Sequence, residues 1–243
     1  MNLRIPVALL AIPLCSCSIV FNGISKGGST VDEQQWTAAF SAEGLDNVTI
    51  FQTKTVAMTI RGEADEKTMS ATGDSRAKYV SGEADITTKQ NTDGKLKQTE
   101  SKIRKDDNGG YVATTTSDGQ TTEAPHAGPA NPSLSFSAFA SGYASYENVG
   151  GIYQNELDSS EALEVIVGMD LGLEVSGDGD GGLSGIAQLT FDQSHRLSRI
   201  FVSIIGPFVS VENGDGEPEP VITIDRFVVS CSFSEYGTTE LSA

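Results

Sequence analysis

Two cysteines, Cys15 and Cys17, stand two positions apart at the end of a short apolar stretch. Paired thiols at close spacing can form a disulfide, hold a metal ion or mark a processing site. A disulfide between neighbours this close is geometrically poor, and cleavage between the two residues would remove it. The residues that precede the pair therefore indicate which chemistry to expect.

Arg4 is followed by an uncharged and almost wholly apolar run, Ile5 to Leu14. One positive charge before about ten apolar residues is typical of a secretory signal peptide, whereas a membrane-spanning helix needs about 20. Signal cleavage requires small residues just before the cut. Ser16 meets that requirement before Cys17, so we expect residues 1–16 to be removed.

The quartet Leu14-Cys15-Ser16-Cys17 resembles the lipobox of bacterial lipoproteins. That resemblance implies a diacylglycerol on Cys17, the new amino terminus, and a location on the extracytoplasmic face of the bacterial cell membrane. The two acyl chains of such a group are enough for stable attachment. The alternative is an ordinary cleaved signal peptide with incidental cysteines.

Motifs for catalysis are weak. Gly182-Leu183-Ser184-Gly185 is followed by Ile186, where a nucleophile elbow needs glycine. Ser75-Arg76-Ala77-Lys78 spells S-x-x-K, but it lies in a region of strands and turns and lacks the motifs that accompany it in penicillin-interacting enzymes. We therefore expect a protein without enzymatic activity and without a cofactor.

Metal-binding patterns are equally weak. His126 and His195 have no histidine or cysteine partner at ligand spacing. The segment SGDGDGG contains Asp178 and Asp180, which could hold calcium, but Leu189 stands where an EF-hand loop starting at Asp178 needs glutamate. A solvated hairpin loop is the simpler interpretation, and we expect no metal site.

The charge balance limits the partners. The chain has 16 Lys+Arg and 33 Asp+Glu, a net charge of −17. Removing residues 1–16 takes away one base, Arg4, so the remaining 227 residues carry 15 − 33 = −18. This balance opposes binding to nucleic acid and anionic headgroups, because phosphates must be neutralised by Lys and Arg. Cys231 is the only later cysteine, so stability must come from an apolar core.

The first half of the chain predicts a helix and then strands. Residues 17–29 read as a tether, and Thr30-Val31-Asp32-Glu33 has the form of a capping box, with Trp36 and Phe40 on one helix face. From residue 47, apolar and β-branched residues alternate, which predicts a long half-buried strand. Turn clusters at 62–66, 72–75, 91–94 and 106–110 separate further, more polar strands, whereas residues 117–133 read as one long loop.

The second half mixes both types of element. Phe136, Phe139, Ala140 and Tyr143 form a helical stripe after a cap at Ser133. We predict a strand in GIYQNEL, a helix in SSEALEVIVGM, a hairpin in IAQLTFDQSHRLSRIFVSIIG and a final strand in PVITIDRFVVSCSFS.

The chain resembles the lipoprotein carriers of the LolA/LppX type in the order of its elements and in three segments. These segments are the hairpin LTFDQSHRLSRIFVSI, the strand and helix GIYQNELDSSEALEVIV and the terminal FSEYGTTEL. The resemblance implies an α+β fold over residues 30–243, in which a strongly curved antiparallel half-barrel sheet has a few helices on its concave side. It implies an apolar cavity for a lipid or lipoprotein acyl chain. The candidate lining residues are Val48, Ile50, Val56, Met58, Ile60, Phe191, Ile200, Val202, Ile204, Ile222 and Ile224.

Two functions follow from these expectations. The first is a membrane-anchored carrier or sensor that binds a hydrophobic ligand without catalysis. The second is an envelope lipoprotein that acts through protein contact, with its convex face or the segment 117–133 as the contact surface.

Overall fold

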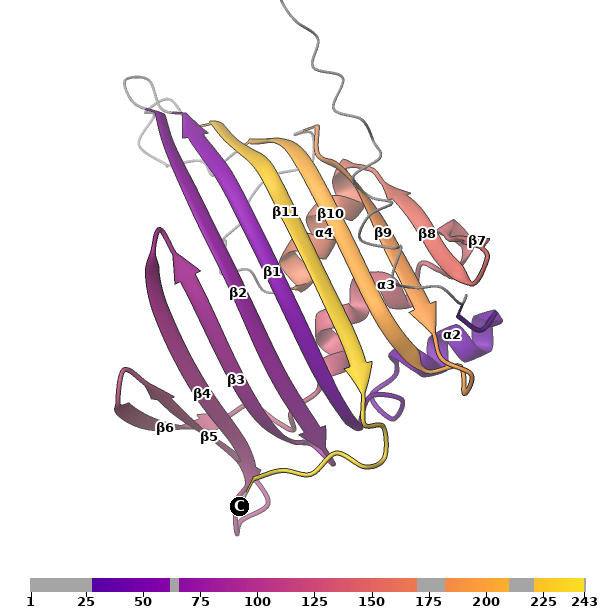
Figure 1. Ribbon diagram of the computed structural model, residues 1–243. Helices are drawn as coiled ribbons and strands as arrows, with labels where there is room; N and C mark the ends of the chain where they lie inside the picture. Colours follow the sequence, from indigo (N-terminus) through magenta and orange to yellow (C-terminus); the bar gives the residue numbers. More distant parts are fainter. Residues whose placement is uncertain (1–27, 62–65, 170–181, 210–220, 243) are drawn as a thin grey trace, which may run out of the picture.

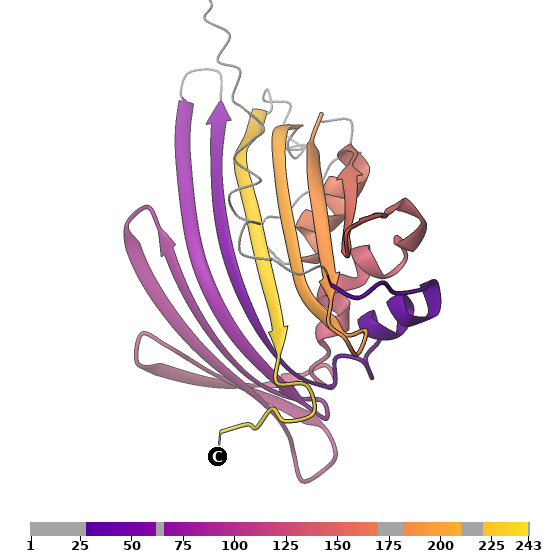
Figure 2. The same cartoon turned by 45° about the vertical axis from the view of Figure 1, so that its right-hand side comes forward.

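The computed structural model describes residues 28–61, 66–169, 182–209 and 221–242. These residues form one open antiparallel sheet of eleven strands, in the order β6-β5-β4-β3-β2-β1-β11-β10-β9-β8-β7. The strands are β1 Asn47–Arg61, β2 Glu66–Val80, β3 Glu83–Thr92, β4 Lys95–Lys105, β5 Tyr111–Ser117, β6 Gln120–His126, β7 Glu147–Val149, β8 Ile152–Leu157, β9 Ser184–Phe191, β10 Leu197–Val209 and β11 Val221–Ser234. The chain therefore has the curved antiparallel α+β architecture that the sequence predicts (Figures 1 and 2).

Short helical segments cover one part of the concave face. They are α2 Glu33–Phe40, α3 Ser137–Ala140 and α4 Ser159–Gly168, with 3₁₀ turns η1 Pro132–Phe136 and η2 Tyr143–Ser145. The segments α3 and α4 lie behind β11, β10 and β9 in Figure 1, and α2 lies beside the lower end of β9. Most of the concave side of β3–β6 has no helix on it, but Ala130 packs against Ala84 on β3 and Ile103 on β4. The sheet thus has a covered half and an uncovered half.

Alternation on the strands decides which side chains meet the helices. On β1 the even-numbered residues Val48, Ile50, Val56 and Met58 are buried. Their partners across the β1–β11 ladder, among them Phe233, are buried as well. Because successive strand residues point to opposite faces, this register places one apolar set against the helices.

Irregular positions bend the long strands. The β10–β11 ladder shifts between Ile204 and Gly206, and the β1–β11 ladder shifts between Ala57 and Met58. Such bulges increase local twist and bend. Gly206 has φ +129°, and a Cβ there would lie 2.5 Å from the carbonyl oxygen of Gly182, so this bend requires glycine.

The first helix starts two residues later than the sequence indicated. Asp32, not Thr30, is the N-cap of α2, and it forms a capping box with Gln35. Trp36, Ala39 and Phe40 are buried as expected. Asp32 accepts a hydrogen bond from the Gln35 amide at 2.8 Å, which satisfies a donor that the first helical turn leaves free.

Two predicted interruptions are in fact strand. Residues 72–75 were expected to turn, but they lie inside β2, where Gly73 pairs with Lys54 and Gln90. The expected long loop 117–133 contains β6, which pairs with β5 around an Asp118-Gly119 turn. Pro125 is tolerated because β6 is the edge strand of the sheet, where a missing backbone donor costs no ladder bond.

The predicted mid-chain helix is broken into short pieces. Asn131, not Ser133, caps the first of them, η1, and the stripe of Phe136, Phe139 and Tyr143 is shared among η1, α3 and η2. By contrast, α4 is confirmed as one helix, with Ala162, Val165 and Ile166 buried. The cover of the concave face is therefore made of pieces between three and ten residues long.

The C-terminal segment crosses the ends of the central strands (Figure 1). The Gly237 amide donates to the Asn47 carbonyl at 3.0 Å. The Ser242 amide and hydroxyl both donate to Asp85, at 2.6 and 2.9 Å, and Asp85 also forms an ion pair with Arg104. Through these contacts the segment that follows β11 links the ends of β1, β3 and β4.

Candidate functional site

The predicted lining residues gather on the concave face of the covered half. Nine of the eleven are at most 9% exposed and belong to one hydrophobic cluster; they are Val48, Ile50, Val56, Met58, Phe191, Ile200, Val202, Ile204 and Ile224. The side chains of Ile60 and Ile222 lie outside the described part of the structure. The nine form the core between the sheet and the helices, so the structure brings together the set that the alternation indicated.

Trp36 anchors the helical cover to this core. The indole is fully buried, its ring lies 5.3 Å from that of Phe191 and 5.4 Å from that of Tyr153, and its N–H donates to the carbonyl of Phe139 at 3.0 Å. Phe139 belongs to α3. One side chain of α2 therefore joins another helix and two strands, β8 and β9.

Tyr153 and Tyr146 complete this aromatic group, and sequence reasoning missed both. Tyr153 holds Val31, which precedes the N-cap of α2, because the Val31 amide donates to the tyrosine hydroxyl oxygen at 2.7 Å and the hydroxyl donates back to the Val31 carbonyl at 2.8 Å. The ring of Tyr146 lies 5.0 Å from that of Trp36. The only sequence signal was the aromatic content of two short segments that could not be paired in advance.

Polarity changes along the rows that cross the middle of the long strands. One such row runs from Cys231 on β11 through Gln52, Ser75 and Thr88 to Thr99 on β4. Directly paired residues point to the same face of a sheet. Along this row the concave surface therefore passes from buried apolar side chains in the covered half to hydroxyl and amide groups in the uncovered half, whereas the row Val48, Tyr79, Ala84 and Ile103 stays apolar.

A small hollow lies at this transition. It has a volume of about 160 Å³ and is lined by Gln52, Lys54, Gly73, Asp74, Ser75, Thr88, Lys89 and Gln90. Gly73 lies at the middle of this lining and has no side chain to fill the space. Since a water molecule takes about 30 Å³ in the liquid, the hollow has room for roughly five waters or a small polar group.

A second hollow lies on the solvent side of the helices. It measures about 450 Å³ and is lined by residues of α3, its C-cap and α4, which are Ser137, Ala138, Ser141, Leu163, Glu164, Val167 and Gly168. Val167 is 56% exposed, and Leu134 of η1 is 69% exposed. Leu134 does not line this hollow, but exposed large apolar side chains such as these two are features of protein contact surfaces.

Burial raises the pKa of the buried thiol and of several phenols. It raises the pKa of Cys231 to about 12, although a hydrogen bond from Gln52 acts in the opposite direction, and it raises the pKa of Tyr79 to about 12. Burial and the charge of Glu161 raise the pKa of Tyr146. These groups therefore stay protonated and uncharged near neutral pH.

The Ser/Lys pair and the two histidines that were candidates for catalysis or metal binding do not come together in the structure. Ser75 and Lys78 lie on opposite faces of β2, because their positions differ in parity. His195 contacts the Gln35 side chain at 2.7 Å, whereas His126 contacts the Gly128 carbonyl at 2.5 Å. Among the described residues, no three His, Cys, Asp or Glu side chains gather as a metal site.

Several predicted features fall outside the described residues. Cys17, the segment 1–16 and the pair Asp178 and Asp180 belong to them. Within the described ranges, no helix is both long enough and apolar enough to cross a bilayer.

Comparison with known proteins assigns this chain to no family. No family model matches the sequence, and no curated protein matches it. A solved structure of a DUF1329 family protein from Desulfovibrio piger aligns over 86% of this chain and 94% of its own, with 8% sequence identity and a TM-score of 0.20. A TM-score this low gives no basis for transferring that protein's fold or function to this chain.

Proposed function

We propose that the protein is a lipoprotein, anchored on the extracytoplasmic face of a bacterial membrane through Cys17, that binds a lipid or lipoprotein acyl chain without catalysis. The observation that carries the proposal is the concave face itself. Nine apolar side chains lie together there under short helical segments. A ligand chain would take the place of part of this cover.

The energetics favour such an exchange. Each methylene buried gains about 0.8 kcal/mol, so an acyl chain with about 14 methylenes would gain roughly 11 kcal/mol before the contacts it displaces are subtracted. Helices as short as α3 and α4 are held by packing and not by their own hydrogen bonds. They can therefore separate from the sheet while the strands keep their pairing.

Mass spectrometry of the protein under native conditions tests the proposal. The full chain, purified from its own membranes, should carry extra mass that matches a lipid, in addition to the acyl groups on Cys17. A protein that always shows only its own covalent mass would overturn the proposal. Peptide analysis of the amino terminus tests the anchor separately, because Cys17→Ala should abolish the acylated peptide.

A substitution in the covered half should block the ligand. Val56 is 7% exposed on the concave face, whereas Thr55 points to the opposite face of the same strand. Val56→Trp should remove the bound mass at a stability cost of about 1–3 kcal/mol. Thr55→Trp is the matched control and should retain it. Equal lipid content in both variants would argue against binding beneath the helices.

A second function rests on the exposed apolar groups of η1 and α4. Leu134 and Val167 could contact a protein partner of the cell envelope, with no small ligand involved. Crosslinking in cells distinguishes the two functions. A specific partner that is lost in Leu134→Ser/Val167→Ser and kept in Val56→Trp would favour protein contact.

A further inference from the structure

The two faces of the first six strands carry different charges. In strands β1–β6, as far as the structure describes them, every acidic residue occupies an outward position; these residues are Glu66, Asp74, Glu83, Asp85, Glu100 and Glu123. No Asp or Glu occupies a concave position in these strands, whereas lysines do; these are Lys54, Lys67, Lys95, Lys97 and Lys105. The concave side of β1–β6 is therefore cationic.

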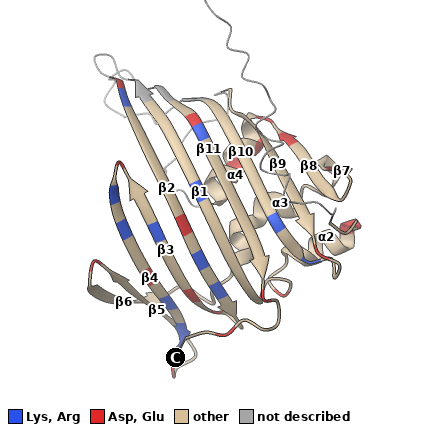
Figure 3. Ribbon diagram, viewed as in Figure 1, with Lys and Arg blue, Asp and Glu red and all other residues tan. Residues whose placement is uncertain are grey.

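This charge runs against the composition of the protein. The whole chain has a net charge of −17, and no Lys or Arg occurs between residues 106 and 195. Figure 3 shows the consequence, because basic positions lie on the long strands while α2, α4 and β8 carry acidic positions only. Charges more than about 8 Å apart in solution are largely screened at physiological salt. An anion on the concave face would thus respond to the nearby lysines more than to the distant acids.

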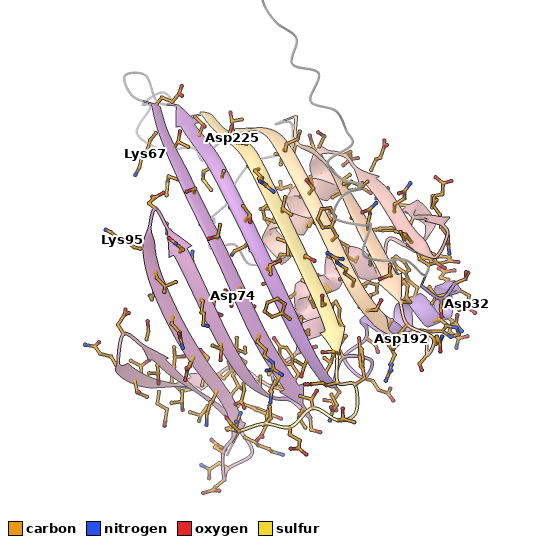
Figure 4. All side chains as sticks on the ribbon, viewed as in Figure 1. Asp32, Lys67, Asp74, Lys95, Asp192 and Asp225 are labelled. Atoms are coloured by element: carbon orange, nitrogen blue, oxygen red, sulfur yellow. The ribbon has the colours of Figure 1, made fainter. Side chains whose placement is uncertain are left out.

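Lys95 and Lys97 on β4 lie beside the polar hollow and face solvent. Lys97 pairs with Gln90, which pairs with Gly73, and this row continues through Lys54 to Val229 on β11. Lys67, Lys95, Lys97 and Lys105 are exposed, and Figure 4 shows Lys67 and Lys95 near the ends of β2 and β4. Lys54 has interactions of its own, so Lys95 and Lys97 carry the argument.

The length of the row suits a lipid that lies across the strands. Four strand spacings of about 4.8 Å separate Lys97 from Val229, roughly 19 Å in all. One leaflet of a bilayer is about 15 Å thick in its hydrocarbon part, half of about 30 Å. An acyl chain that ends in the covered half would therefore bring its headgroup to the region between Gly73 and Lys97.

We propose that the uncovered concave face binds the anionic headgroup of a phospholipid whose acyl chains lie in the covered half. This inference rests on the proposed function and adds the class of lipid to it. The lysine ammonium groups would donate charge-assisted hydrogen bonds to the phosphate, and the Ser, Thr and Gln side chains of the same rows would bind the glycerol oxygens. The site prefers anionic over zwitterionic lipids with the same chains.

A competition experiment tests this preference. Phosphatidylglycerol and phosphatidylcholine with identical acyl chains are offered in equal amounts to the full chain in a mild detergent, and native mass spectrometry measures which is bound. The natural protein should favour phosphatidylglycerol. Lys95→Gln/Lys97→Gln should lower that preference about fivefold, since two exposed charge contacts are lost, while total lipid binding persists. Added salt should weaken the preference of the natural protein.

An outward pair provides the control. Lys102 and Arg226 are exposed and occupy outward positions on β4 and β11, so Lys102→Gln/Arg226→Gln removes the same charge from the other face and should leave the preference unchanged. If the two double variants behave alike, or if the natural protein binds both lipids equally, this inference is overturned and lipid binding itself stands. If the natural protein binds neither lipid, the proposed function fails as well.

Discussion

The hydroxyl group of Tyr153 should be worth a measurable part of the folding free energy. It accepts from the Val31 amide at 2.7 Å and donates to the Val31 carbonyl at 2.8 Å, and both residues are at most 3% exposed. Tyr153→Phe keeps the ring, which packs edge-on against Phe191 at 5.5 Å. The substitution therefore removes two hydrogen bonds and little else.

The expected loss follows from what remains at Val31. Its carbonyl still faces the hydroxyl of Tyr143 at 3.4 Å, but no described group replaces the acceptor for its buried amide. An unsatisfied buried donor costs about 1–3 kcal/mol, so we expect a loss of about 2 kcal/mol. For a chain of this size that corresponds to a fall in Tm of about 6 °C.

Denaturant unfolding and amide exchange measure the two parts of this effect. Tyr153→Phe should lower the free energy of unfolding by about 2 kcal/mol, and the Val31 amide should exchange about 30-fold faster. Tyr143→Phe is the matched control, because its long hydrogen bond should contribute less than about 0.5 kcal/mol. Equal stability of the two variants would refute the assignment of Tyr153 as the residue that holds the chain ahead of α2.

Three further outcomes are expected. Asp85→Asn should destabilise the protein at neutral pH, because Asp85 ties β3 to the C-terminal segment. Burial alone would raise the pKa of Asp85, but hydrogen bonds from Ser242 and Arg104 outweigh burial and lower that pKa below its usual 3.8. A carboxyl group whose pKa is lower in the folded state stabilises that state at pH values above its unfolded pKa. Denaturant unfolding at a series of pH values should therefore show that the difference in unfolding free energy between natural protein and variant shrinks as the pH falls below about 4. The Cys231 thiol, with its pKa raised to about 12 by burial, should react with thiol reagents at pH 8 only as fast as the protein unfolds, and rapid labelling of native protein would contradict its placement. Gly206→Ala should lower the free energy of unfolding by more than about 1 kcal/mol in thermal unfolding. Gly94→Ala is the comparison, because a Cβ there meets nothing within 4 Å and only the positive φ of Gly94 destabilises the variant.

Local patterns predicted the parts of the fold that follow one period. The alternation in β1 and the stripe of α4 were correct, because in each the buried face is marked by every second residue or by every third and fourth. The apolar half of the candidate site followed from the same alternation. These inferences needed only neighbours in sequence.

Features that depend on distant partners were missed. Gly73 and Asp74 have the composition of a turn, but β1 and β3 supply ladder bonds on both sides and hold them in β2. β6 reads as a loop until β5 is placed beside it. The aromatic group around Trp36 joins α2 to β8 and β9, which follow α2 by more than 100 residues in the chain. Propensity is overridden in each case by tertiary pairing.

The register of the polar strands in the first half determines which face of the sheet each charged side chain occupies. Read alone, β4 is a hydrophilic strand with Lys95, Lys97 and Glu100 in ordinary alternation. The ladders place Lys97 in the row of Val229 and turn Glu100 to the other face. A strand that needed only solubility could carry either sign on either face. The exclusion of every acid from the concave side of β1–β6 therefore indicates selection for what that side contacts, and an anion is the contact that such a surface stabilises.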